Sequence, residues 1–254
     1  MTEMSKIIPI LEEKFVIPSY FVDENAQMTV SCLFRILQEM SNKHASLLGA
    51  GWYQLRERGF FWVITKIQLK INRLPKWEEV VTLRTWVKKS NAATSPRDYE
   101  MVDADGNVLV AGSSIWAILD IEHSHPQHMQ LFDGYFLPQD RDAIDQKPKR
   151  INALELPEET SNWKTAVPSD IDMNHHVNNA HYIQWAFDSV NQSFKETHQI
   201  TDVAVNFISQ AKLGDRYAIH TKHISDTGYQ TTLYSPDNKQ EFCRILTDWK
   251  SIIQ

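Results

Sequence analysis

The sequence has few cysteines and no long apolar run near its start. Only two cysteines, Cys32 and Cys243, occur in 254 residues, and they belong to no paired motif. This pattern favours packing roles in a reducing compartment over a disulfide framework. Residues 1–14 are polar apart from a short Ile-Ile-Pro-Ile stretch, which is too short for a signal peptide or a membrane span. We therefore predict a cytoplasmic protein with no membrane partner.

The sequence also lacks an excess of positive charge. Lys and Arg number 26 against 32 Asp and Glu, which gives a formal net charge of −6. Binding to phosphates requires a concentrated excess of Lys and Arg, so we predict that the protein is not a general nucleic-acid binder. The chain does contain 42% hydrophobic and 23% charged residues, which is typical of a globular protein that buries a core. Its length allows one large domain or two small ones.

Two stretches far apart in the chain share one apolar pattern. A shift of 147 positions lays the apolar residues of the first on those of the second: Val30, Leu33, Ile36, Met40 and Leu47 on Val177, Ala180, Ile183, Phe187 and Phe194. Their spacing of three and four predicts an amphipathic helix in each stretch. Polar residues at the start of each are candidate N-caps: Thr29 or Ser31, and Asn178 or Asn179.

Alternating apolar segments follow each predicted helix. They predict strands at 62–72, 80–88, 97–102 and 108–119 in the first half, and at 202–208, 216–224, 230–234 and 241–249 in the second. Asp105-Gly106 predicts a hairpin turn. One helix followed by antiparallel strands, twice over, predicts an α+β protein in which each sheet covers its helix. Two unrelated helix-then-strand domains would give a similar pattern.

The second helix is preceded by a polar loop, from Ser169 to Asn179. Asp172, Asn174 and His176 alternate by two, so an extended segment would point all three side chains the same way. The free N–H groups and the dipole of the following helix favour negative charge nearby. This arrangement indicates a catalytic site, although Asp and Asn are also common in simple capping loops.

In this loop the sequence resembles the acyl-acyl carrier protein (acyl-ACP) thioesterases. The family's Asp-x-Asn-x-His-Val-Asn-Asn-x-x-Tyr pattern, with Trp after it, is matched by Asp172, Asn174, His176, Val177, Asn178, Asn179, Tyr182 and Trp185. Positions that resemble the family's first half are Trp62, Pro75, Trp77, Val81, Arg84-Thr85-Trp86, Arg97-Asp98-Tyr99-Glu100 and Ser114-Ile115-Trp116. The resemblance extends from about Phe15 to the end of the chain. It implies a tandem hotdog fold, with two long helices each wrapped by an antiparallel sheet.

The stretch from 136 to 160 contains three prolines among charged residues and has no clear periodicity, which predicts a linker. The predicted domains are therefore an N-terminal hotdog domain at 1–135 and a C-terminal hotdog domain at 161–254. Under the 147-residue shift, Asp172, Asn174 and His176 fall on Asn25, Gln27 and Thr29. In this alignment the first half has lost every ionisable member of the site, so we predict a degenerate site there and catalysis in the second half.

Thioester hydrolysis needs a base for water and donors for the developing oxyanion. We predict that Asp172 acts as base or orients the water, that His176 shares in proton transfer, and that Asn174 donates to an oxygen or holds the water. We expect backbone N–H groups near the helix start to bind the oxyanion, namely those of Val177, Asn178 and Asn179.

The sequence departs from the family pattern at one site position. The family's pattern implies a Glu on the strand after the second helix, where this chain has Gln210. Glutamine cannot take a proton at neutral pH, although it can hold a water. The next position, a Cys in some plant relatives, is Ala211, which favours direct attack by water over an acyl-enzyme.

Two further sets of residues are predicted from their chemistry. Large apolar side chains of the first half are candidates for an acyl pocket, although each one alone is better explained as core: Phe34, Leu37, Phe60, Phe61, Trp62, Ile64 and Trp116. An acidic carrier protein would require basic residues, and two predicted strands that we expect to be neighbours supply them. The candidates are Lys66 and Lys70, with Arg73, on the first strand and Arg84 and Lys88, with Lys89, on the second, and Lys147, Lys149 and Arg150 form a rival patch. Such charges also occur on the solvated face of any sheet.

The histidines outside the loop predict no metal site. His123, His125 and His128 cluster near Pro126 without Cys or carboxylate partners at ligand spacing. We predict an enzyme that needs no cofactor and hydrolyses fatty acyl-ACP to release the fatty acid and end chain elongation. Acyl-CoA hydrolysis and a non-enzymatic acyl sensor are the alternatives. The acyl chain preference and the oligomeric state are not determined, and a homodimer is allowed.

Overall fold

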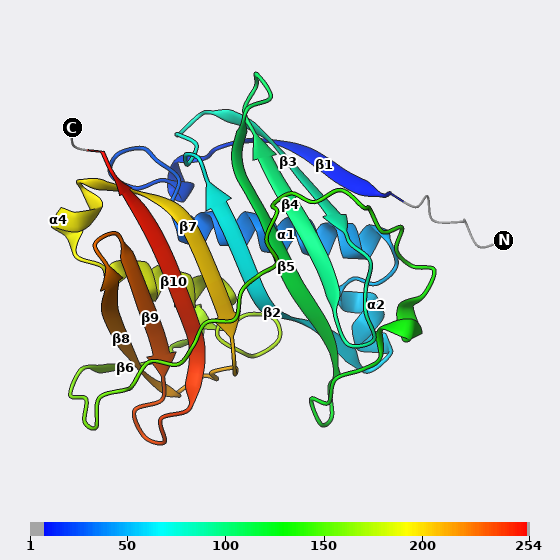
Figure 1. Ribbon diagram of the computed structural model, residues 1–254. Helices are drawn as coiled ribbons and strands as arrows, with labels where there is room; N and C mark the ends of the chain where they lie inside the picture. Colours follow the sequence, from blue (N-terminus) through cyan, green and yellow to red (C-terminus); the bar gives the residue numbers. More distant parts are fainter. Residues whose placement is uncertain (1–7, 253–254) are drawn as a thin grey trace.

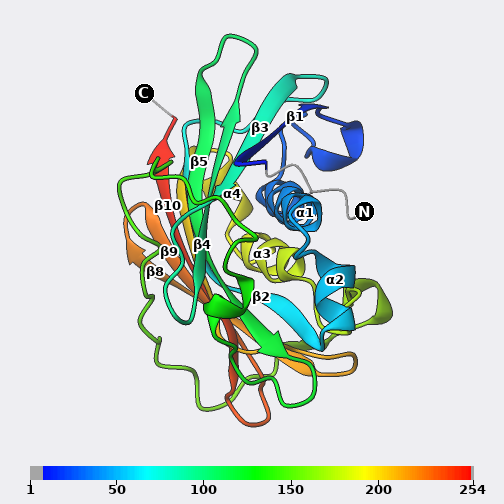
Figure 2. The same cartoon turned by 90° about the vertical axis from the view of Figure 1, so that its right-hand side faces the viewer.

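The structure, a computed structural model, describes residues 8–252 and consists of one large sheet with helices on one face (Figures 1 and 2). The sheet has ten strands in the order β1-β3-β4-β5-β2-β7-β10-β9-β8-β6. All neighbouring pairs are antiparallel. Helices α1 and α3 contact each other on the inner face of this sheet.

The first half contains β1 (Ile10–Val16), η1 (Ser19–Phe21), α1 (Val30–Leu47), α2 (Trp52–Glu57), β2 (Phe60–Ile71), β3 (Val80–Val87), β4 (Ser95–Val102), β5 (Val108–Asp120) and η2 (Met129–Phe132). The second half contains β6 (Trp163–Thr165), η3 (Pro168–Asp170), α3 (Asn179–Asp188), α4 (Gln192–Lys195), β7 (His198–Phe207), β8 (Arg216–Ser225), β9 (Gly228–Tyr234) and β10 (Glu241–Ser251). The eight predicted strands are confirmed to within a few residues. The edge strands β1 and β6 were missed, because β1 carries charged residues in its middle and β6 has only three exposed residues.

The two halves are joined by pairing between β2 and β7, from Lys66 opposite Asn206 to Lys70 opposite Asp202. Lys70 and Asp202 also form an ion pair across this junction. The predicted α+β double hotdog arrangement is confirmed, with one refinement: the two expected sheets are one continuous sheet. The apolar residues of α1, α3 and the inner strand faces form a single buried cluster.

Helix α1 begins where the polar pattern predicted. The side chain of Thr29 caps it by accepting a hydrogen bond from the N–H of Cys32 (3.2 Å). Ten of its residues are buried, mostly on one side, including Leu33, Ile36 and Met40. This is the apolar stripe expected for a helix that packs on a sheet.

Helix α3 is shorter than predicted. Asn178 caps it by accepting from the N–H of Ala180 (2.9 Å), and it ends at Asp188 after ten residues. The Ser189 hydroxyl donates to the carbonyl of Ala186 (2.7 Å), and Asn191 then caps the separate short helix α4. Ser and Asn compete with helical hydrogen bonds through their own side chains, so the predicted long second helix is divided in two.

The internal repeat is confirmed, but its offset is 149 residues, not 147. The caps Thr29 and Asn178 are 149 positions apart, as are the short helices η1 and η3. A bridge between Val22 and Met28 has its counterpart between Ile171 and Val177. The apolar pattern misled the alignment because it does not show where each helix begins, whereas the two caps do.

The segment between η2 and β6 has no helix or strand among its residues and crosses the outer face of the sheet, opposite α1 and α3 (Figures 1 and 2). Its backbone N–H groups donate to polar side chains of three strands: Ala143 to Asp98 (2.9 Å), Lys149 to Gln68 (3.4 Å) and Ile151 to Asn206 (2.8 Å). These bonds satisfy buried polar groups on the outer face, so the segment is a fixed strap across the sheet.

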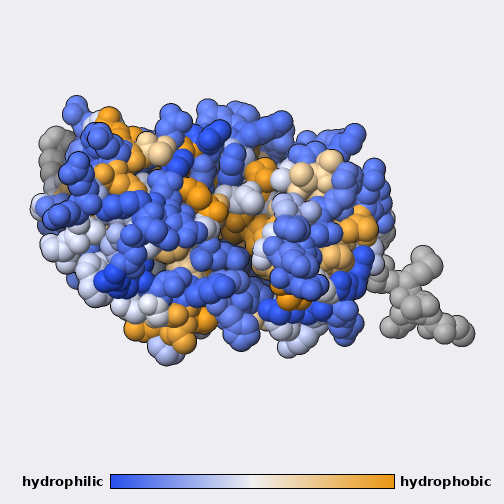
Figure 3. Space-filling model, turned by 90° about the horizontal axis from the view of Figure 1, so that it is seen from below, coloured by the Kyte–Doolittle hydropathy of each residue, from blue (hydrophilic) through white to orange (hydrophobic). Residues whose placement is uncertain are grey.

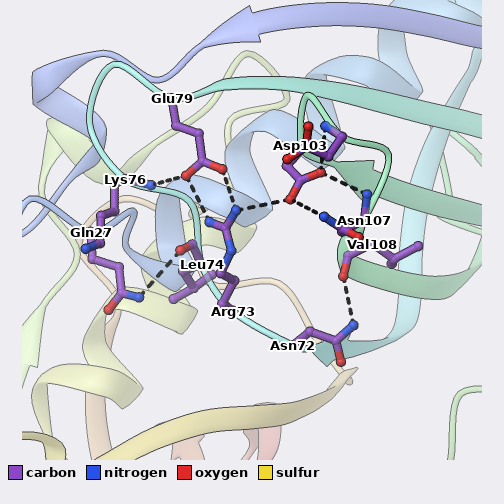
Figure 4. A network of polar contacts seen from close by, with 10 residues as sticks. Gln27, Asn72, Arg73, Leu74, Lys76, Glu79, Asp103, Asn107 and Val108 are labelled. Atoms are coloured by element: carbon purple, nitrogen blue, oxygen red, sulfur yellow. Dashed lines mark hydrogen bonds and ion pairs between the residues drawn. The ribbon is translucent and has the colours of Figure 1, made fainter.

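A polar network holds the loop between β2 and β3 against the β4–β5 turn (Figure 4). Arg73 donates two hydrogen bonds to Glu79 (2.9 and 2.7 Å) and contacts Asp103 (3.4 Å). The Arg73 hydrogen bonds hold the pKa of Glu79 below its ordinary value. Arg73 is therefore committed to this loop and is not a free docking residue.

Candidate active site

The polar loop before α3 is a tight turn, and the prediction of an extended segment is wrong. The N–H of Asp172 donates to the carbonyl of His176 (2.8 Å), and the N–H of His175 donates back to Asp172 (3.0 Å). His175 has a positive φ of 64°. The Asp172 carboxylate accepts the N–H of Asn174 (2.8 Å), as Asp side chains commonly do in turns. The turn still brings Asp172, Asn174 and His176 to the wall of one cavity.

That cavity lies between α1, the inner face of β2 and β5, and the polar loop of residues 169–179, which we call the active loop. Its volume is about 660 Å³. The molecule is hollowed on the side seen in Figure 3, where apolar residues in the middle are surrounded by hydrophilic ones. The walls include four of the predicted acyl-pocket residues: Phe61, Trp62, Ile64 and Trp116. Phe34 and Leu37 line a small recess that shares residues with the cavity, whereas Phe60 packs in a separate cluster.

The helix start supplies fewer free donors than predicted. The N–H of Val177 donates to the carbonyl of Ala211 (2.8 Å), and the N–H of Asn178 donates to Asp170 (2.9 Å). These two groups anchor the loop and are not free to bind an oxyanion. Among the hydrogen bonds of residues 8–252, the N–H of Asn179 has no acceptor, and Asn179 lines the cavity. Of the three predicted backbone donors, Asn179 alone remains available.

His176 is half-buried, and burial lowers the pKa of its imidazole below the ordinary value. Nearby Lys212, His175 and Arg56 lower this pKa further, while Asp172 opposes them. The ring is therefore neutral at pH 7. Its Nδ1 atom is buried and has no hydrogen-bond partner among the described residues. A neutral imidazole with a free nitrogen can accept or pass on a proton.

Gln210 lies in the loop after β7, not on the strand as predicted. Its side chain is exposed and lines the cavity. The neighbouring Ala211 is buried, and its N–H donates to the Tyr182 hydroxyl (3.0 Å), which ties this loop to α3. Neither Cys32 nor Cys243 lines the cavity, and burial raises the pKa of the Cys243 thiol well above its ordinary value.

The cavity wall also contains a buried cation, to which the sequence interpretation gave no role in the site. Arg97, only 5% exposed, donates to His44 Nδ1 (2.9 Å) and to the Thr85 hydroxyl (3.1 Å). His44 Nε2 bonds to the carbonyl of Ile8 (2.7 Å), so Nδ1 is the acceptor and the ring is neutral. Burial and the Arg97 charge lower the pKa of His44 to about 4. Alternation along β4 could have indicated that Arg97 lies on the inner face of the sheet. No sequence pattern indicated that it would pair with His44 on α1.

The predicted docking residues do not form one patch at the cavity. Lys66 and Lys70 are on β2, Arg84 is on β3 and Lys88 directly follows β3, but β5 and β4 lie between β2 and β3, so the prediction that these strands are neighbours is wrong. Lys70 pairs with Asp202, Arg84 with Glu12 and Lys88 with Asp142. None of the four lines the cavity. Sequence periodicity cannot determine strand order, and the docking role stays a prediction.

The remaining histidines lie apart from the cavity. His123 stacks on His125 and contacts Asp120, and His128 caps η2. Among residues 8–252, no group of three or more His, Cys, Asp or Glu is arranged to hold a metal. His181 approaches Asp170 (3.5 Å) and Arg35 (3.4 Å), and although Arg35 lines the cavity, His181 itself does not.

Fold and site together define a double hotdog protein with one polar loop at an apolar cavity, and comparison with known proteins identifies the family. The acyl-ACP thioesterase N-terminal domain matches residues 10–131, and the acyl-ACP thioesterase C-terminal domain matches residues 157–251. The chain belongs to the acyl-ACP thioesterase family.

Similar proteins occur in plants and bacteria. The chain is 28% identical over 256 aligned residues to oleoyl-acyl carrier protein thioesterase 1 of Arabidopsis thaliana, covering 92% of this chain and 71% of the relative. It is also 28% identical to an acyl-[acyl-carrier-protein] hydrolase of Cuphea viscosissima, covering 94% of this chain and 62% of that protein.

Solved structures share the fold over nearly the whole chain. An acyl-ACP thioesterase from Bacteroides thetaiotaomicron has a TM-score of 0.86 at 23% identity, covering 95% of this chain and 98% of that one. The 12:0-ACP thioesterase from Umbellularia californica has a TM-score of 0.83 at 20% identity, covering 95% and 97%.

Proposed function

We propose that this protein hydrolyses the thioester of fatty acyl-ACP, releasing the free fatty acid and ending chain elongation. The observation that carries the proposal is the position of the active loop: Asp172, Asn174 and His176 meet at the wall of a cavity of about 660 Å³ that is also lined by large apolar side chains. Membership of the acyl-ACP thioesterase family supports the same reaction.

The proposed reaction uses water as the nucleophile. Asp172 or His176 takes a proton from water as the oxygen attacks the thioester carbon, and the carbonyl oxygen becomes negative. The N–H of Asn179 and the side-chain amide of Asn174 are the donors placed to stabilise this oxyanion. The carbon–sulfur bond then breaks, and the thiolate leaves with a proton from the same acid–base groups. Gln210 holds the water by hydrogen bonds.

The acidic carrier protein would bind near the cavity entrance, where several basic side chains gather. Arg35 is exposed and lines the cavity, and Lys212 and Arg56 lie close enough to lower the pKa of His176. Opposite charges across an interface mainly speed association and select the partner. We therefore propose this rim as a docking surface, in competition with Lys66, Lys70, Arg84 and Lys88, which were predicted from the sequence.

One assay distinguishes the proposed function from the two alternatives, an acyl-CoA thioesterase and a non-enzymatic acyl sensor. A steady-state assay compares the same acyl chain on carrier protein and on CoA, for a panel of chain lengths. We expect a higher kcat/KM with the carrier. Turnover with CoA alone would support the acyl-CoA thioesterase alternative. Tight acyl binding without turnover on either would support the acyl sensor, which the replacement of Glu by Gln210 keeps under consideration.

Location and assembly stay predictions of the sequence. None of the helices formed by residues 8–252 combines the length and hydropathy needed for a membrane span. We propose a cytoplasmic location, which cell fractionation tests directly, whereas the plant relatives carry the word chloroplastic in their names. A homodimer would appear as a doubled mass in analytical ultracentrifugation.

A further inference from the structure

Helix α2 of the first half contacts the active loop of the second half. The indole Nε1–H of Trp52 donates a hydrogen bond of 2.7 Å to Oδ1 of Asn174, although the two residues are 122 positions apart. Both residues line the cavity. The first half therefore reaches the polar end of the cavity as well as its apolar walls.

This contact determines how the Asn174 side chain is oriented. The indole N–H is a donor only, so the Asn174 atom that it meets must be the carbonyl oxygen. The NH₂ group of the same amide has no hydrogen-bond partner among the described residues, and its nitrogen is not fully buried. Its two donors are accordingly left to the cavity. Without Trp52, the amide could turn over and present an acceptor instead.

The indole is itself held in place. The Arg56 guanidinium lies over the Trp52 ring at 4.9 Å, and the Tyr53 ring meets it edge-on at 5.0 Å. The backbone N–H of Asn174 donates to the Asp172 carboxylate (2.8 Å), so the residue that Trp52 holds also holds the predicted base. A change at Trp52 therefore reaches Asn174 directly and Asp172 through it.

We propose that Trp52 is a positioning residue for hydrolysis, which fixes the Asn174 amide with its NH₂ group toward the thioester oxygen or the attacking water. The proposal rests on the proposed hydrolase function and adds a residue of the first half to the active site. Trp52 acts through Asn174 and touches no reacting atom. Small displacements of such groups lower the rate because the donors must meet the transition-state oxygen at hydrogen-bond distance.

The main test is Trp52→Phe, which removes the donor and keeps an aromatic ring beneath Arg56. We expect kcat on acyl-ACP to fall about tenfold, with KM within about twofold, because one neutral hydrogen bond that orients a catalytic group is lost. Tyr53→Phe on the same helix, at an exposed side chain, is the matched control and should keep full activity. An unchanged kcat in Trp52→Phe would overturn the proposal.

A double-mutant cycle separates positioning from a general loss of structure. Trp52→Phe should have no further effect on kcat in an Asn174→Ala background, because the amide to be oriented is already absent. Equal losses in both backgrounds would show that Trp52 acts independently of Asn174 and would overturn the proposal. If Trp52→Phe melts at a lower temperature, Asn174→Asp provides the second variant: it keeps an acceptor for the indole but lacks the NH₂ donors, so full activity would overturn the proposal.

One readout does not depend on activity. The ¹⁵N–¹H indole resonance of Trp52, assigned by its loss in Trp52→Phe, should shift in Asn174→Ala, because its acceptor is removed. An unmoved resonance would overturn the contact itself. Absence of wild-type turnover on any acyl thioester would instead defeat the proposed function, so the two failures are distinguishable.

Discussion

The two halves of the protein contain the same turn before their helices, and only one of them lies at the cavity. With the offset of 149, Asp23 matches Asp172, Asn25 matches Asn174, and Gln27 matches His176. The hydrogen bonds repeat as well: the N–H of Asp23 donates to the carbonyl of Gln27 (2.8 Å), and the Asp23 carboxylate accepts the N–H of Asn25 (2.9 Å). Ala26 has a positive φ of 56°, and its counterpart His175 has one of 64°.

This comparison corrects the prediction that the first half has lost every ionisable member of the site. It keeps an aspartate and an asparagine, and it lacks only the histidine. Asp23 and Asn25 are exposed, and neither lines the cavity. The Asp-x-Asn part of the motif therefore serves the turn in both halves, and we predict that catalysis requires in addition the imidazole and the cavity beside it.

The largest expected effect separates the two aspartates. Asp172→Asn should lower kcat by about 10²–10⁴-fold, because a general base or a water-orienting carboxylate is removed. Asp23→Asn should leave kcat unchanged, since the amide oxygen can still accept the N–H bonds of the turn. Steady-state kinetics on acyl-ACP, with circular dichroism to verify folding, makes the comparison. Equal effects of the two substitutions would show that the Asp172 role is structural.

The next effect is the loss of stability in acid that the buried His44 of the first half causes. Between pH 6.5 and about 4 the unfolded chain binds a proton at His44 that the folded protein does not, so unfolding becomes easier as the pH falls. The expected loss is roughly 3 kcal/mol, and it is complete near the folded pKa.

Urea unfolding at several pH values tests this in wild type and in His44→Gln, which can replace both hydrogen bonds of the ring. The variant should lose less stability on going from pH 7 to pH 4. The lowered pKa of His176 acts in both proteins and cancels in the difference. Parallel curves for the two proteins would show that His44 does not control the acid response.

Gln210→Glu tests whether the site in the second half lacks a proton acceptor at this position. A carboxylate at this position would add a proton acceptor at the cavity, and we expect kcat to rise by at most about tenfold, since the side chain is exposed and its charge is screened by water. Rates measured against pH provide the check. A lower rate would show that the amide of Gln210 donates a hydrogen bond that the reaction needs.

The smallest effect compares the helix caps. Thr29→Ala and Asn178→Ala should each lower the free energy of unfolding by about 1 kcal/mol, because each removes one side-chain acceptor at a helix start. Only Asn178→Ala should also lower kcat, since this cap orients the helix start at the active loop. Thermal melts and kinetics on both variants decide whether the caps differ in this way.

Much of the fold was predictable because it depends on short-range patterns. The eight longer strands follow from alternation, and Thr29 and Asn178 were among the named caps. The end of α3 and the strand β6 were not predictable, because a break at Ser189 and a three-residue edge strand leave little trace in apolar periodicity. The candidate site was predicted as a set of residues, but its turn geometry and its usable donors were not.

The sequence by itself determined the starts of α1 and α3, the eight longer strands and the repetition of the pattern, and it predicted which loop carries the reactive side chains. Caps, turns and alternation depend on residues close in the chain. Only the tertiary structure decided that β2 pairs with β7 and that Trp52 and Arg97 lie at the cavity. It also decided that the N–H groups of Val177 and Asn178 form hydrogen bonds that anchor the loop. These contacts join residues many positions apart, and their partners are selected by packing of the whole core.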